Sequence, residues 1–148
     1  MPKASIKRLI ECKKKQLIDL VLDIEKYPIF LPFCIDSKVH KKKENSDLVL
    51  IIADLTIGKG PFIDTYKSDV RFNKKNDLIT VTNIGGPLIY LKNTWNFKDN
   101  QEGTEVFFNI DFEIENKFLN IIMKKSFQFG IEKIADAFQK RANELFDN

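Results

Sequence analysis

The hydrophobic period changes from two residues to between three and four within the stretch EVFFNIDFEIENKFLNIIMKKSFQFG, residues 105–130. Its first part alternates apolar and polar side chains, which predicts a strand with one buried face over 105–115. From residue 118 the apolar residues form a helical stripe, which predicts one long helix that continues to residue 145. Because a strand with one apolar face needs a second layer, we expect this helix to cover the sheet.

Alternating or largely apolar segments upstream predict further strands. They follow one another at 35–39, 48–57, 62–72, 78–84 and 91–97, and polar residues or glycine and proline end each of them. A first strand over 3–11 and an amphipathic helix over 13–25 precede them. Short turns between consecutive strands imply an antiparallel meander. The predicted fold class is therefore α+β, with a seven-stranded antiparallel sheet around the C-terminal helix and an interior that large side chains fill or leave as a cavity.

Two prolines, Pro28 and Pro32, lie four residues apart in the apolar segment YPIFLPFC, residues 27–34. Proline fixes φ and donates no backbone hydrogen bond, so both cannot lie inside one regular helix. An apolar segment that must bend is either a plug for the core or a lid over an apolar cavity. The segment alone leaves both interpretations open.

The composition predicts a globular protein with one domain over residues 1–148. Phenylalanine is abundant, with 13 residues, and the net charge is only +3, which argues against DNA as a partner. The pair Lys124-Lys125 is one of several short basic runs, which are usually solvated faces. The alternative is weak contact with anionic lipid headgroups at a membrane.

The location that these features predict is the cytoplasm, with at most peripheral contact with the inner membrane. No run approaches the roughly 20 apolar residues of a membrane span, and no apolar stretch near the N-terminus has the form of a secretory signal. Cys12 and Cys34 have no metal or redox spacing, so we expect free thiols and no bound metal.

Residues for catalysis are scarce, and we predict that the protein is not an enzyme. His40 is the one histidine and stands beside three lysines in a predicted strand end or turn, which favours a surface residue over a general base. We find no nucleophile elbow or phosphate loop. The single tryptophan, Trp95, lies on a predicted inward face, where it either packs in the core or lines a ligand pocket.

Several segments together resemble the coenzyme Q-binding START-like family, part of the polyketide cyclase/dehydrase and lipid-transfer superfamily. They are residues 23–34, Gly86-Pro87-Leu88 with Leu91, Trp95-Asn96-Phe97, Asp111-Phe112-Glu113, and AFQKRA at 137–142 near the end of the long helix. The resemblance extends over essentially the whole chain. Two departures, Phe33 where relatives often carry Trp or Gly and Leu88 where Phe is usual, keep their apolar character.

This resemblance implies a helix-grip fold around a hydrophobic tunnel. It also implies ubiquinone, or a similar polyisoprenoid lipid, as the bound ligand and partner, with no catalytic cofactor and a role in supporting respiration. A bacterial branch of the family is described as a ribosome association toxin that blocks subunit joining, so a ribosome-associated translation inhibitor is the alternative.

Strand parity and the helical stripe predict the residues of the tunnel. The predicted wall consists of Phe33, Leu55, Ile57, Phe62, Trp95, Phe97, Phe108, Ile110, Ile122 and Ile131. Phe30, Leu31 and Phe33 are the predicted lid, and Lys124 and Lys125 are the predicted membrane contacts. An isoprenoid tail needs large, smooth apolar walls that exclude water, which many phenylalanines supply. Ribosome binding asks instead for a concentrated basic surface, and this chain has only three arginines, which are far apart in sequence.

Overall fold

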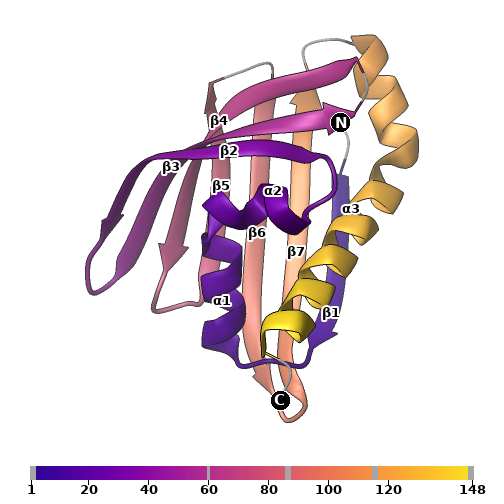
Figure 1. The fold of residues 1–148 in the computed structure, drawn as a ribbon. Helices are drawn as coiled ribbons and strands as arrows, with labels where there is room; N and C mark the ends of the chain where they lie inside the picture. Colours follow the sequence, from indigo (N-terminus) through magenta and orange to yellow (C-terminus); the bar gives the residue numbers. More distant parts are fainter. Residues whose placement is uncertain (1–2, 60, 86–87, 115–116, 147–148) are drawn as a thin grey trace.

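The computed structural model describes the backbone of residues 3–59, 61–85, 88–114 and 117–146, and their side chains except at 59, 62, 88, 114 and 117–127. A long C-terminal helix lies along one side of an antiparallel sheet (Figure 1). In chain order the elements are β1 (Lys3–Ile10), α1 (Lys14–Leu22), the 3-10 helix η1 (Ile24–Lys26), α2 (Tyr27–Phe30), β2 (Cys34–Glu44), β3 (Leu48–Lys59), β4 (Phe62–Asn73), β5 (Leu78–Gly85), β6 (Leu88–Asn100), β7 (Gly103–Ile114) and α3 (Lys117–Phe146).

The sheet has seven antiparallel strands in the order β1-β7-β6-β5-β4-β3-β2. Consecutive strands from β2 to β7 are neighbours, and β1 pairs with β7, so the predicted meander and the predicted fold class are confirmed. Figure 1 shows α3 beside β1, and α1 and α2 in front of β5 and β6. We call the face of the sheet that these helices cover the concave face.

Alternation along each strand divides the two faces. In β6 the inward residues Leu91, Asn93 and Phe97 are buried, whereas Lys92 and Lys98 next to them are exposed. This period of two follows from the pleat of a strand, in which successive side chains point to opposite faces. The inward residues therefore form a continuous, mostly apolar surface beneath the helices.

Two hydrophobic clusters occupy the concave face. The first, which we call the main core, joins α1 and the C-terminal half of α3 to the sheet and includes Leu17, Ile51, Ile79 and Phe138. The second, which we call the second core, consists of Ala4, Leu91, Phe108, Phe112 and Ile131, with partly buried neighbours such as Tyr66 and Trp95. Burial of these side chains is the largest favourable contribution to the stability of the fold.

Strand β2 differs from the prediction in length and in parity. It continues to Glu44, well beyond the predicted 35–39, because pairing with β3 forms a ladder even where the lysine side chains are exposed. Ile35 was expected on the same face as Ser37 and Val39, but a register shift between Cys34 and Asp36 leaves it 51% exposed. A bulge of this kind shifts the side-chain alternation by one residue.

Two local features of the backbone complete the description of the fold. The predicted helix over 13–25 is α1 followed by the separate turn η1, because α1 ends at Leu22. Gly103 begins β7 with φ 150°, and a Cβ there would lie 2.2 Å from the Ile10 carbonyl oxygen. Only glycine permits this close approach of the β6–β7 turn to the end of β1.

Candidate ligand-binding site

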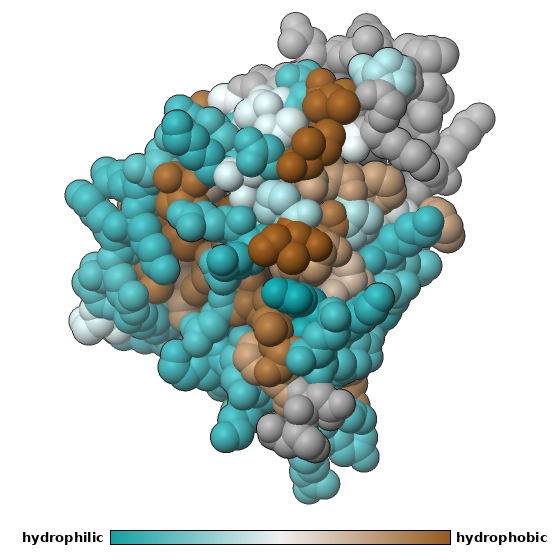
Figure 2. Space-filling model, viewed as in Figure 1, coloured by the Kyte–Doolittle hydropathy of each residue, from teal (hydrophilic) through white to brown (hydrophobic). Residues whose placement is uncertain are grey.

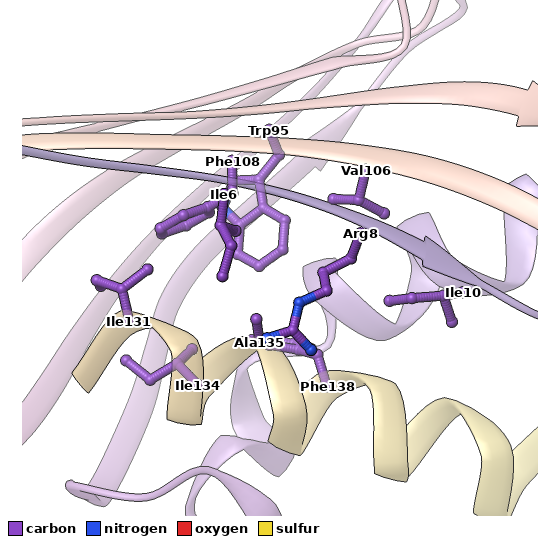
Figure 3. A pocket seen from close by; sticks show the side chains of 10 residues that line it. All are labelled: Ile6, Arg8, Ile10, Trp95, Val106, Phe108, Ile131, Ile134, Ala135 and Phe138. Atoms are coloured by element: carbon purple, nitrogen blue, oxygen red, sulfur yellow. The ribbon is translucent and has the colours of Figure 1, made fainter. Parts of the chain in front are cut away.

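A small apolar cavity lies between α3 and the sheet (Figure 3). It is lined by Ile6, Arg8, Ile10, Trp95, Val106, Phe108, Ile131, Ile134, Ala135 and Phe138. Its volume is about 20 Å³, which is room for about one water molecule. Three of the predicted tunnel residues, Trp95, Phe108 and Ile131, lie in this wall, and their contact with a ligand stays a prediction.

Trp95 is the centre of an aromatic group in the cavity wall. Its ring meets Phe108 edge-on with the centroids 4.6 Å apart, and Phe138 of α3 edge-on at 5.1 Å. Its indole Nε1 donates a hydrogen bond of 2.9 Å to Asn93 Oδ1, and Asn93 Nδ2 donates one of 2.9 Å to the Asn109 carbonyl. The polar edge of the indole is therefore satisfied within the sheet, and the ring is held in a fixed orientation.

Arg8 is the one charged side chain among the described residues that line the cavity. It extends from β1 to α3 (Figure 3), where its Nη1 lies 2.6 Å from Asp136 Oδ1 and 3.2 Å from Gln139 Oε1. Arg8 was not among the predicted site residues, although it shares the inward parity of Ala4, Ile6 and Ile10. A charged residue at an inward position was the signal, because such residues are rarely buried without a partner.

The predicted lid packs beside the C-terminal half of α3. Phe30 meets the Phe138 ring edge-on at 5.3 Å, and the Arg141 guanidinium lies 5.7 Å from the Phe30 ring centroid. Leu31 packs against the main core, while Phe33 is half-buried with φ 67° and its carbonyl accepts a hydrogen bond from Gly58. In this conformation the segment packs against the main core. Its movement as a lid stays a prediction.

The remaining predicted wall residues are spread along the concave face. Leu55 and Ile57 are half-buried on β3, Phe97 is buried in the main core, and Ile110 packs against the second core. The side chains of Phe62, Ile122, Lys124 and Lys125 lie outside the described residues. The cavity thus brings together only part of the predicted set.

Neutral polar side chains accompany the apolar ones on this face. Ser68 is 1% exposed, and its hydroxyl has no hydrogen-bond partner. Burial raises the pKa of the Tyr66 hydroxyl far above its ordinary value. Burial, and to a lesser degree the charge of Asp36, raises the pKa of the Cys34 thiol to about 11. All three groups are uncharged at neutral pH, and burial keeps the tyrosine and the cysteine uncharged to higher pH.

His40 does not contribute to this face. His40 lies inside β2 and not at a strand end or turn, and its Nε2 is 2.7 Å from Asp54 Oδ2. Asp54 alternates with the buried Ala53, which places this pair on the opposite, convex face. Within the described ranges no group of three His, Cys, Asp or Glu residues could hold a metal ion. The helices of the same ranges include none with the length and hydropathy to cross a bilayer.

A groove between α2 and α3 borders the cavity region on the outside. Ile29, 64% exposed, lies in it with Lys133 and Lys140 of α3. Figure 2 shows this apolar surface over α2 surrounded by polar side chains. The groove is open to solvent and is separated from the cavity by Phe138 and its aromatic neighbours.

Comparison with known families identifies the class of the chain. The family model described as polyketide cyclase / dehydrase and lipid transport matches residues 10–139. The chain therefore belongs to this family, and the resemblance noted in the sequence is confirmed.

Two relatives carry names of different kinds. The chain is 34% identical to the ribosome association toxin RatA of Rickettsia prowazekii (strain Madrid E), over 93% of this chain and 94% of that protein. It is 29% identical to the coenzyme Q-binding protein COQ10, mitochondrial, of Dictyostelium discoideum, over 88% of this chain and 64% of that protein. Both names describe binding or association.

Solved structures share the fold at low sequence identity. A START superfamily protein from Mycobacterium smegmatis superposes with a TM-score of 0.81 at 14% identity, covering 97% of this chain and 98% of its own. The Zhui aromatase/cyclase from Streptomyces sp. R1128 also gives 0.81, at 10% identity over 98% and 96%. The helix-grip architecture is thus confirmed, and it is shared with enzymes of the same fold.

Proposed function

We propose that the chain binds ubiquinone, or a similar polyisoprenoid lipid, between α3 and the concave face and delivers it in support of respiration. The observation that carries this proposal is the aromatic wall around Trp95, which faces a cavity lined almost wholly by apolar side chains. Such walls hold an isoprenoid tail by close packing. The coenzyme Q-binding relative supports the choice of ligand class.

Binding on this face requires a change of conformation. The cavity of about 20 Å³ is far smaller than the roughly 300–1,000 Å³ of ordinary ligand pockets. The element that must move is α3, because it forms one whole wall and, among the described side chains, few polar links join it to β1. Arg8 makes the shortest of them, to Asp136.

The proposal is for a single-domain binding protein that performs no catalysis. Its cavity wall offers apolar side chains and one guanidinium that is paired with Asp136, which is a poor set for acid–base chemistry. We place it in the cytoplasm, in peripheral contact with the inner membrane. Lys124 and Lys125 stay the proposed membrane contacts, and exposed Ile29 near Lys133 is a further candidate.

Mass spectrometry of organic extracts tests the proposal. The protein is purified from a quinone-producing host, and near-stoichiometric ubiquinone in the extract is the expected result. Phe108→Ala is expected to lose most of the bound quinone because it removes a ring of the aromatic wall.

Phe107→Ala is the matched control for that variant. Phe107 is the preceding residue on β7 and lies on the convex face under the Lys7 side chain. It should retain quinone like the wild type. A folded wild-type protein without quinone, or equal retention in both variants, contradicts the proposed site.

The alternative function is a ribosome-associated inhibitor that blocks subunit association, and the similarity to the RatA relative favours it. The edge strand β2 supplies the surface it would use, because Lys41, Lys42 and Lys43 are exposed there. Co-sedimentation with ribosomal particles that weakens steeply with salt, and is lost on charge reversal of these lysines, would support it. Absence of co-sedimentation at low salt would exclude it.

A further inference from the structure

A hydroxyl group is buried on the concave face without a partner, and this is costly in any protein interior. Ser68 of β4 is 1% exposed, and its Oγ makes no hydrogen bond. Its parity is that of the buried residues Val70 and Phe72, so the hydroxyl points inward. The group is therefore available to whatever enters this side of the sheet.

Two other inward hydroxyl groups of the same sheet are satisfied. Thr104, at 0% exposed, donates a hydrogen bond of 2.8 Å to the Cys12 carbonyl. Ser37 donates one of 2.9 Å to the Ile24 carbonyl. Both bonds connect the sheet to the segment around α1, where the main core lies. Ser68 differs from them because its hydroxyl is unpaired and because it lies between Val70 of the main core and Tyr66, which packs against the second core.

The surroundings of Ser68 connect it to the aromatic wall. Across the strands it lies opposite Ala53 of β3 and opposite Asn83 of β5. Tyr66, two residues earlier on the same face, packs against the cluster that contains Phe108 and Ile131. Ser68 and Tyr66 thus form a polar margin to the second core, on its β4 side.

The charge state of this margin restricts the ligand. Tyr66 and the nearby Cys34 are neutral at pH 7, and burial raises the pKa of each further above that pH. Arg8, at the β1 side of the cavity, is already paired with Asp136. A phosphate or carboxylate buried here would find, among the described residues of the cavity wall, no cation other than the paired Arg8, which is unfavourable. A neutral carbonyl or hydroxyl oxygen is the group that fits.

We propose that Ser68 and Tyr66 donate hydrogen bonds to a carbonyl or hydroxyl oxygen on the uncharged head of the bound lipid. The head then lies at β4 and the isoprenoid tail lies along Trp95 and Phe108 toward α3. This inference rests on the proposed function and adds to it the chemistry of the head group and the orientation of the ligand.

The test separates recognition of the head from recognition of the tail. Ubiquinone with two isoprene units is titrated while the fluorescence of Trp95, the single tryptophan, is followed. Squalene, an isoprenoid hydrocarbon without oxygen, is measured by its competition with that quinone. Ser68→Ala and Tyr66→Phe should each weaken quinone binding by about three- to tenfold, the effect of one hydrogen bond, and leave the squalene constant unchanged.

Ser37→Ala is the matched control, because it removes a hydroxyl that is bonded within the protein, and it should leave the quinone affinity unchanged. Unchanged quinone affinity in both β4 variants overturns the head-group site, as does an equal loss for quinone and squalene. If the wild-type protein binds neither lipid, the proposed function itself fails. These results are distinguishable in one set of titrations.

Discussion

The two clusters on the concave face belong to one sheet but differ in how completely they are enclosed. In the main core Leu17, Ile51 and Ile79 are each 1% exposed. Every residue of the second core is 4–7% exposed, and the cavity lies where the two clusters meet, because its wall includes Phe108 and Ile131 of the second core and Phe138 of the main core. Close packing supports stability, whereas incomplete enclosure leaves space that a ligand can enter. Stability therefore resides mainly in the enclosed part of the main core, and the proposed ligand site lies where the second core meets it.

The largest expected effect tests where the stability resides. Leu17→Ala should lower the free energy of unfolding by about 2–5 kcal/mol, because a fully enclosed side chain leaves a cavity. Ile134→Ala should cost clearly less, since Ile134 is half-buried and already borders a void. Urea denaturation measures both. Equal losses would contradict the division into a rigid and an adaptable half.

Two variants that each remove one buried hydroxyl group test the same difference between the clusters. Thr104→Val should destabilise the protein by about 1–3 kcal/mol, because the Cys12 carbonyl then loses its buried donor. Ser68→Ala removes an unpaired hydroxyl and should be neutral or slightly stabilising. Both are measured by chemical denaturation of the lipid-free protein. A loss in Ser68→Ala as large as in Thr104→Val would mean that the Ser68 hydroxyl is bonded in solution.

Alkaline pH gives a smaller effect through Cys34. Its folded pKa of about 11 lies above the ordinary value of 9.0, so the unfolded chain releases the thiol proton first as pH rises. Stability is therefore full below about pH 9 and decreases between pH 9 and 11, by about 1 kcal/mol at pH 10. Cys34→Ala should reduce the loss of stability between pH 8 and pH 10.

Cys12 of the main core provides the control for that titration. Burial raises the pKa of its thiol as well. Cys12→Ala should therefore also reduce the alkaline loss, but less than Cys34→Ala. The measurement is the difference in unfolding free energy between the two pH values. A larger effect of Cys12→Ala than of Cys34→Ala would mean that the more strongly desolvated thiol lies in the main core.

The fold was largely predictable because its signal is local. The period of two along β7 and the helical stripe of α3 specify their elements, and the glycine, proline and polar turns specify the meander. Where pairing between strands decides the outcome, the prediction was wrong: the bulge at Ile35 and the length of β2 depend on β3. A sequence pattern does not contain this information about the neighbouring strand.

The candidate site was less predictable, because parity gives the face of a residue but not its neighbours. Trp95, Phe108 and Ile131 meet around the cavity, whereas Phe97, with the same parity as Trp95, packs in the main core. Arg8 and Ser68 were missed because single polar residues on an apolar strand face carry little pattern. The significance of Arg8 depends on Asp136, a partner distant in sequence. The significance of Ser68 depends on the lack of a hydrogen-bond partner in the folded structure.

The smallest expected effect on stability concerns the contact between β1 and α3, the two elements that must separate to admit a ligand. Arg8→Met keeps most of the apolar packing and removes the ion pair with Asp136, which is 65% exposed. The free energy of unfolding should change by less than about 1 kcal/mol. Amide hydrogen exchange in α3 should nevertheless become faster, and quinone should associate faster as measured by Trp95 quenching, because the helix separates from the sheet more often.

Lys15→Met is the control for a mere loss of charge, since it removes an exposed pair with Asp19 on α1, away from the cavity. It should leave both α3 exchange and quinone association unchanged. If Arg8→Met changes stability but neither rate, then Arg8 only supports packing and the entry of ligand takes another path. If both rates rise while stability stays nearly constant, the strength of one ion pair controls access to the second core, and the main core remains folded throughout.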